Sequence, residues 1–228
     1  MTQITDHLAN IHSRTANALA ASGRVADQVM LLAVSKQQPA AAIEEAYRAG
    51  QRHFAENFLQ ESLAKIQTLS LADIQWHFIG RIQSNKTRSI AEHFQWVHTV
   101  DRPKIAARLN EQRPHSAAPL NVLIQVNQGD EQQKAGVSET EVADLARLIL
   151  AQPRLNFRGL MSIPPQNDLQ QHSSVYFQRL QELKIHLTEQ GIPVDYLSMG
   201  MSADFESALA NGSNCIRIGT GIFGQRVN

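Results

Sequence analysis

The sequence predicts an α/β protein: a single (β/α)8 barrel of the TIM type with an additional N-terminal helix. Short apolar runs rich in β-branched residues alternate with longer segments that have helical spacing, and the chain has 228 residues. This alternation implies parallel strands joined by right-handed crossovers. Eight repeats in about 200 residues favour a closed barrel. Because the second and fourth runs are short, an open, doubly wound sheet is the alternative.

The elements follow in chain order. An extra helix is expected over 3–21, within an N-terminal segment of residues 1–25, and the barrel over 30–226. The expected strands are MLLAV (30–34), HFA (53–55), IQWHFI (74–79), WVHTV (96–100), LNVLIQV (120–126), LNFRGLM (155–161), VDYLSM (194–199) and CIRIG (215–219).

Helices are expected between these runs. PAAAIEEAYRAG (39–50) opens with proline and closes on glycine, the usual asymmetry of helix ends. In SETEVADLARLILA (138–151), Ser138 is a plausible N-cap, and Glu141 three residues later would complete a capping box. Two further helices are expected over 170–190 and 203–211.

Composition narrows the class of function. The 21 basic and 21 acidic residues cancel, so no nucleic-acid or anionic-membrane surface is expected. No apolar stretch approaches the roughly 20 residues that span a bilayer, and MTQITDHLAN does not have the pattern of an export signal. The single Cys215 cannot form an internal disulfide, which fits a cytoplasmic location.

Lys36 is the first candidate functional residue. It ends LLAVSK (31–36), two residues past the first strand, and side chains at the carboxyl ends of barrel strands line the site. A solvated lysine at a strand end is one interpretation. A lysine that is partly desolvated at a barrel mouth is the other, because desolvation favours the neutral amine that attacks a carbonyl.

The segment after the seventh and eighth strands suggests a phosphate site. Ser202 precedes a short helix, and Gly219, Thr220 and Gly221 directly follow the eighth strand. Loops in these positions are the recurrent phosphate site of this barrel. In the alternative interpretation, Ser202 only caps the helix and the glycines only form a turn, with no ligand bound. The serine and the glycine-rich turn in these two loops together favour a phosphate site.

Arg217 alternates with Ile216 and Ile218 in the eighth strand and must therefore face the opposite side. If the isoleucines face the helices, Arg217 points into the barrel, where a charge is costly unless paired. It could form a structural salt bridge or bond a ligand's ring nitrogen.

Seven motifs in order extend over about residues 30–226: AVSKQQP (33–39), FAENFLQE (54–61), WHFIGRIQSNK (76–86), VNQGDEQQKAG (126–136), GLMSIPP (159–165), LSMGMSADFESAL (197–209) and IRIGTGIFGQR (216–226). Together they resemble the pyridoxal phosphate homeostasis protein family, whose fold is similar to the barrel domain of alanine racemase. The resemblance implies that Lys36 forms an aldimine with pyridoxal 5′-phosphate (PLP) and that Arg217 faces the pyridine nitrogen.

The resemblance also assigns the other cofactor contacts. It implies that Asn57 lies near the ring substituents, that Ser202, Gly219 and Thr220 hold the phosphate, and that Met201 packs nearby. His77 and Met161 would line the site, with Lys86 and Lys134 as other basic groups near the cleft. The family commonly has a second basic residue two places after the Schiff-base lysine, where this chain has Gln38.

The function implied is that of a PLP carrier and buffer in PLP and amino-acid homeostasis, with PLP-dependent apo-enzymes as possible recipients and no strong catalysis. We expect a cytoplasmic monomer. The alternatives are a PLP-dependent amino-acid racemase, for which Tyr47, Tyr176 and Tyr196 offer no obvious second acid/base, and an aldolase-type phosphosugar enzyme that uses Lys36. No metal site is expected, because His93 and His98 do not have a zinc spacing, and Trp76 and Trp96 are expected in the core.

Overall fold

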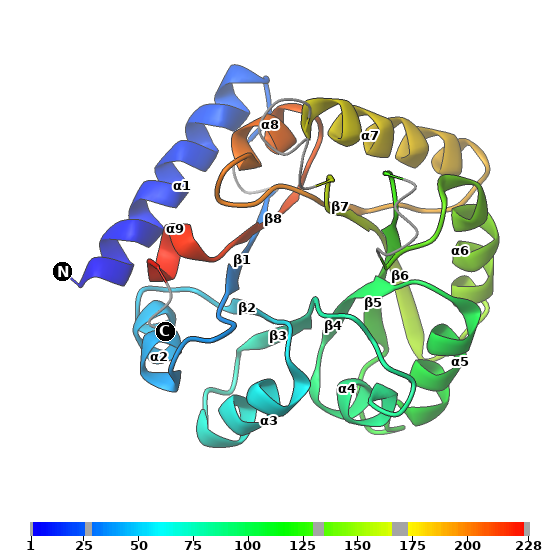
Figure 1. Ribbon diagram of the computed structural model, residues 1–228, viewed down its shortest axis with the longest axis horizontal. Coiled ribbons are helices and arrows are strands. Elements are labelled where there is room, and N and C mark those ends of the chain that lie inside the picture. The colour runs from blue at the N-terminus through cyan, green and yellow to red at the C-terminus, as the bar shows by residue number, and fades with distance from the viewer. Residues whose placement is uncertain (1, 26–28, 130–134, 166–172, 226–228) are drawn as a thin grey trace.

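The computed structural model describes residues 2–25, 29–129, 135–165 and 173–225. Its centre is a closed barrel of eight parallel strands in the order β1 to β8, with β8 pairing to β1, and Figure 1 shows the helices around this ring. The (β/α)8 barrel is confirmed, and the open sheet is wrong. The strands are β1 (Met30–Val34), β2 (His53–Glu56), β3 (Gln75–Phe78), β4 (Trp96–Val100), β5 (Leu120–Val126), β6 (Leu155–Ser162), β7 (Tyr196–Ser198) and β8 (Cys215–Ile218).

The described helices lie outside the barrel. They are α1 (Gln3–Ala21), α2 (Ala40–Arg48), α3 (Leu59–Thr68), α4 (Thr87–His93), α5 (Pro103–Gln112), η2 (Glu139–Glu141), α6 (Val142–Leu150), α7 (Ser173–Glu189), α8 (Phe205–Ala210) and α9 (Thr220–Phe223). The predicted capping interaction is present, since the Glu141 carboxylate accepts the Ser138 backbone N–H at 3.0 Å. This capping interaction lies at the start of the 3₁₀ turn η2, which leads into α6.

The predicted N-terminal helix is confirmed as α1. Leu8, Ile11 and Leu19 are buried on one face of it, and the helix lies beside α8 and α9 (Figure 1). Polar contacts hold it there, because Nε of Arg14 in α1 donates to the Glu206 carboxylate of α8 at 2.7 Å. Just past the helix, the Arg24 guanidinium donates to the carbonyl of Leu209 at 2.6 Å. The helix therefore packs behind the two loops that follow β7 and β8.

Two apolar layers result from strand alternation. Ile216 and Ile218 pack in the large cluster between the strands and the helices, whereas Leu32, Val34 and Cys215 form a smaller cluster inside the barrel. Successive side chains of a strand face opposite sides. This alternation decides which residues can reach the barrel mouth.

The ends of two elements differ from those predicted. The seventh strand is shorter than predicted and covers Tyr196–Ser198, and the glycine-rich turn after β8 contains the short helix α9. The N-terminal end of the helix predicted over 170–190 lies outside the described residues. Trp76 and Trp96 are buried, as expected.

Candidate functional site

A pocket of about 280 Å³ opens at the carboxyl ends of the strands, where this barrel type places its sites. All seven residues predicted to contact the cofactor line it: Lys36, Asn57, Met201, Ser202, Arg217, Gly219 and Thr220. Met161 also lines it, as expected, and sequence reasoning missed Val34, Ile79, Ile163 and Ala203. One cavity therefore collects residues from the carboxyl ends of strands β1, β2, β6, β7 and β8.

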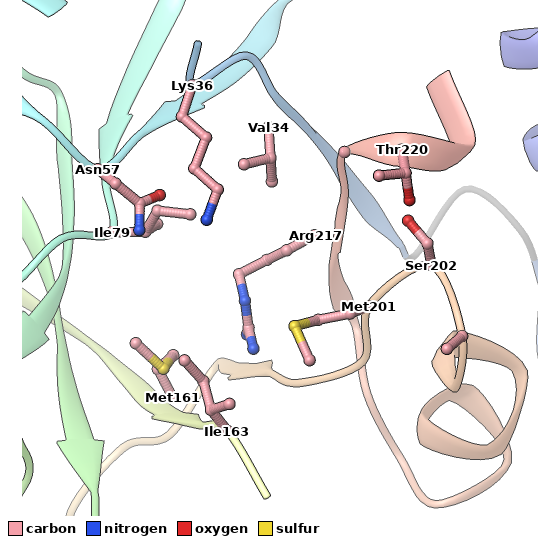
Figure 2. A pocket seen from close by; sticks show the side chains of 12 residues that line it. Val34, Lys36, Asn57, Ile79, Met161, Ile163, Met201, Ser202, Arg217 and Thr220 are labelled. Carbon is pink, nitrogen blue, oxygen red and sulfur yellow. The ribbon is translucent and has the colours of Figure 1, made fainter. Parts of the chain in front are cut away.

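The Lys36 side chain reaches into this pocket. Strand β1 ends at Val34, whose side chain faces the barrel interior, and alternation places Lys36 on the same side. Figure 2 shows the Lys36 amine between the Asn57 amide and the Arg217 guanidinium. The residue is half-buried, so the amine is partly removed from water.

Asn57 follows the last residue of β2. Its Oδ1 atom is buried and has no hydrogen-bond partner among the described residues. Gly80 permits the close approach of the Asn57 backbone, because a Cβ at residue 80 would collide with the Asn57 carbonyl oxygen. A buried carbonyl oxygen without a partner is costly in a folded protein, and Asn57 lines the pocket, where a ligand could supply a hydrogen bond.

Arg217 is buried, with 4% of its surface exposed. Its Nη1 donates to the Ser198 carbonyl at 2.6 Å and to the Ser198 hydroxyl at 2.9 Å, and its Nη2 donates to the Ser162 carbonyl at 2.9 Å. Among the ion pairs of the described residues none includes Arg217, so the salt-bridge interpretation is not supported. Carbonyls hold the guanidinium at the pocket wall, next to Met201 (Figure 2).

The loops after β7 and β8 meet at Ser202. Its hydroxyl accepts the Gly221 backbone N–H at 3.3 Å, and Figure 2 shows the Ser202 and Thr220 hydroxyls close to each other. The Asp204 carboxylate holds the first loop, because it accepts the Met201 N–H at 2.6 Å. Hydroxyls and backbone amides that converge at one end of a pocket are suitable donors for a phosphate.

The expectation that His77 lines the pocket is wrong. His77 is fully buried inside the barrel, below the pocket. Its ring nitrogens lie 3.0 Å from His53 and 2.9 Å from His98, and Nδ1 of His98 lies 3.0 Å from the Ser198 hydroxyl. Strand alternation places all three histidines inside, on β2, β3 and β4. A row of imidazoles thus connects the lower barrel to Arg217 through Ser198.

Burial lowers the pKa of His77 and of His98 well below the ordinary value. Repulsion between protonated rings adds to the effect for His77, and repulsion from Arg217 and His53 adds to it for His98. Both rings are therefore neutral near pH 7. A neutral imidazole has one donor and one acceptor, which suits a chain in which each ring bonds the next. Sequence reasoning could not find this row of hydrogen-bonded side chains, because its members come from different strands that are separated in the sequence.

None of the other candidates that the structure describes lines this pocket. Lys86 lies near the pocket, as expected, because it lines an adjoining cleft that shares Asn57 with it. Lys134 lies outside the described residues. Tyr47 bonds Asp73 on the outer surface at 2.5 Å. Across the described ranges, no group of three or more His, Cys, Asp or Glu side chains is placed to hold a metal ion. Gln38 lines a small recess beside Lys36, Gly219 and Thr220.

Comparison with known proteins identifies the family. The family model described as "Alanine racemase, N-terminal domain" matches residues 9–227. The chain is 50% identical to the pyridoxal phosphate homeostasis protein of Vibrio alginolyticus over 230 residues, with 99% of both chains covered. It is 46% identical to that of Escherichia coli strain K12, with 99% of this chain and 98% of the relative covered. The chain belongs to the pyridoxal phosphate homeostasis protein family.

Solved structures of this family share the fold. PipY of Synechococcus elongatus, in a structure with PLP bound, is 35% identical and superposes with a TM-score of 0.85 over 97% of this chain and 100% of PipY. The alanine racemase of Bacillus anthracis is only 16% identical, with a TM-score of 0.66 over 98% of this chain and 57% of that one. The second likeness concerns the barrel fold alone.

Proposed function

We propose that this protein binds PLP reversibly through Lys36, carries or buffers it, and so contributes to intracellular PLP and amino-acid homeostasis. The single observation that carries the proposal is the meeting of a half-buried lysine amine, a buried arginine and a hydroxyl-and-amide cluster in one pocket. Family membership supports it, because the relatives are named for PLP homeostasis and PipY has been solved with PLP bound.

The residues present fit this cofactor. Asn57 offers a buried oxygen that has no partner among the described residues, which a hydroxyl on the ring could satisfy. Ser202, Thr220 and the backbone at Gly219 offer donors for the phosphate. Arg217 can donate to the pyridine nitrogen but cannot accept from it.

PLP supplies an aldehyde, and the chemistry needed from the chain is a neutral amine beside it. The Lys36 nitrogen adds to the aldehyde carbon, water leaves, and a C=N bond replaces the C=O bond. Addition of water reverses the step and releases the cofactor, so no oxidant or reductant is needed. Partial burial of Lys36 favours the neutral amine.

Two features favour a carrier over an enzyme. An arginine at the ring nitrogen leaves the pyridine unprotonated, which weakens its capacity as an electron sink. The described side chains that line the pocket include no tyrosine, histidine or carboxylate that could act as a second acid/base opposite Lys36. We therefore propose that the protein has no strong catalytic activity.

The second candidate is a PLP-dependent amino-acid racemase, which the match to the alanine racemase domain favours. It predicts that a single enantiomer of an amino acid becomes racemic during prolonged incubation with the loaded protein. Chiral chromatography distinguishes the two functions, since a carrier leaves the enantiomer unchanged.

The carrier function is tested by transfer. The loaded, desalted protein is mixed with the apo form of a PLP-dependent enzyme, and recovery of that enzyme's activity is followed. We expect recovery with the parent protein and none with Lys36→Ala prepared in the same way. If the enzyme recovered equal activity with the parent protein and with Lys36→Ala, a role for Lys36 in carrying PLP would be contradicted.

We also propose a cytoplasmic monomer. Each of the eight described strands pairs on both sides because the barrel is closed, so these strands present no free edge for association. The single cysteine is buried and free. In the part of the chain that the structure describes, no helix is both long and apolar enough to cross a bilayer.

A further inference from the structure

A buried polar cluster lies behind Lys36, on the side of β1 and β2 that faces α3. Its members are Ser35, Glu56, Glu61 and Lys65. Alternation explains its place, because Lys36 and Asn57 face the pocket while their neighbours Ser35 and Glu56 face the helix layer. The side chains of Lys65 and Glu56 are 8% and 0% exposed.

Lys65 joins the two strand ends to the helix. Its ammonium group donates to the Ser35 carbonyl at 2.7 Å, to Oε1 of Glu56 at 2.8 Å and to Oε1 of Glu61 at 2.5 Å. The Ser35 hydroxyl also donates to Oε1 of Glu56, at 2.7 Å. An ammonium has three donors, and here each of them has an acceptor.

Lys36 itself is the second residue of a tight turn. The Gln38 N–H donates to the Ser35 carbonyl at 3.0 Å and closes the turn. Gln37, its third residue, has a φ of 60°, and among the described non-glycine residues no other φ is positive. This conformation is unfavourable for a residue with a Cβ. The Glu61 carboxylate holds it, because it accepts the Gln37 N–H at 2.5 Å.

The cluster thus holds the backbone on both sides of Lys36. Lys65 and Glu56 bind the carbonyl and hydroxyl of Ser35, and Glu61 binds the N–H of Gln37. Burial raises the pKa of the Glu56 carboxyl, and Lys65 acts in the opposite direction. Replacing a buried ion pair by apolar residues is often neutral for stability, so stability alone does not account for the place of this pair directly behind Lys36.

We propose that Glu61 and Lys65 are positioning residues that fix the turn at residues 35–38 and thereby aim the Lys36 amine at the cofactor aldehyde. This inference rests on the proposed function of Lys36. Aligned groups react faster because the orientation is fixed before the encounter. A loosened turn would leave Lys36 present but misdirected.

Glu61 is the residue to change. Its side chain is 28% exposed, whereas loss of Lys65 would leave Glu56 buried without its ion-pair partner. Glu61→Ala removes the acceptor for Gln37, and Glu61→Gln keeps a neutral acceptor. Glu44→Ala is the matched control, because Glu44 pairs with Arg48 at (i, i+4) on the exposed face of α2.

Two measurements are made on each purified full-length protein: amide hydrogen exchange of Gln37 without PLP, and the rate of visible-band formation after PLP is added. With Glu61→Ala we expect faster exchange of Gln37 and imine formation slowed about tenfold, because orientation is lost. Glu61→Gln should lie between this variant and the parent, and Glu44→Ala should behave as the parent.

Parental exchange and parental imine formation in Glu61→Ala would overturn the positioning role while leaving Lys36 as the carrier residue. A parent protein that forms no imine would instead overturn the proposed function, and the positioning role with it. The two failures are therefore distinguishable within one set of proteins.

Discussion

Arg217 donates a hydrogen bond of 2.9 Å to the hydroxyl of Ser198, which also lies 3.0 Å from Nδ1 of His98. One hydroxyl therefore links the arginine of the pocket wall to the histidines inside the barrel. Because all three groups are buried, the loss of this hydroxyl would leave a buried polar atom without its partner.

Ser198→Ala should lower the free energy of unfolding by about 1–3 kcal/mol, the usual cost of an unpaired buried polar group. Ser162→Ala is the matched control. Ser162 is equally buried and its carbonyl also binds Arg217, but its hydroxyl has no partner among the described residues. Urea unfolding of the two variants checks this, and an equal loss in both would contradict it.

The free energy of unfolding should decrease as the pH is lowered below about 6.5. The folded pKa values of His77 and His98 lie below the ordinary 6.5, so the unfolded chain binds protons that the folded barrel does not. Below that pH, each histidine lowers the free energy of unfolding by about 1.4 kcal/mol for each unit by which the pH is decreased. Between about pH 7.5 and about pH 5.5, the two histidines together lower it by about 2–3 kcal/mol.

His77→Phe, which keeps a ring stacked on Trp96, should remove about half of this pH-dependent loss. The raised pKa of Glu56 acts in the opposite direction, and comparison of the parent with the variant cancels it. Urea unfolding at both pH values is the measurement. The interpretation would be refuted by identical pH dependence in the two proteins.

Ser202→Ala should weaken the binding of PLP about tenfold, because the hydroxyl at the phosphate end of the pocket is lost. Binding of pyridoxal, which lacks the phosphate, should change little. Spectral titration with both aldehydes checks the assignment. A variant that loses affinity for both in equal proportion would place Ser202 elsewhere than at the phosphate.

Gly221 and Gly219 should differ in their tolerance of a side chain. A Cβ at Gly221 would lie 2.9 Å from Cγ2 of Ile218 and 3.3 Å from Cδ1 of Ile11, whereas at Gly219 the nearest atom is the Val34 carbonyl oxygen at 3.5 Å. Gly221→Ala should cost about 1–3 kcal/mol of stability through overpacking, and Gly219→Ala much less. Thermal unfolding of the two variants is the measurement. A Gly219→Ala protein less stable than Gly221→Ala would contradict the packing described.

The sequence predicted most of the fold because each strand is a short apolar run bounded by helical spacing, from Met30 to Ile218. It also predicted that Lys36, Ser202 and Arg217 share the pocket, since they lie in or after barrel strands whose ends meet at one mouth, and the family resemblance added Asn57.

Contacts between distant segments were beyond sequence reasoning. Lys65 reads as an ordinary helix lysine, and only the folded chain brings it to Ser35 and Glu56. His77 was expected at the pocket because it belongs to the WHFIG motif. It faces the barrel interior on the same side as Ile79, which lines the pocket, but it lies two residues earlier in the strand and is fully buried in the inner row of histidines. Pairing across strands depends on register, which local patterns do not specify.

The most direct test of the account is to load the protein with PLP, reduce it with borohydride, digest it and locate the modified residue by mass spectrometry. We expect a visible absorption band that disappears on reduction, with the adduct on Lys36, and neither band nor adduct in Lys36→Ala. A protein that stays colourless with PLP, or an adduct that persists at this site without Lys36, would contradict the central claim.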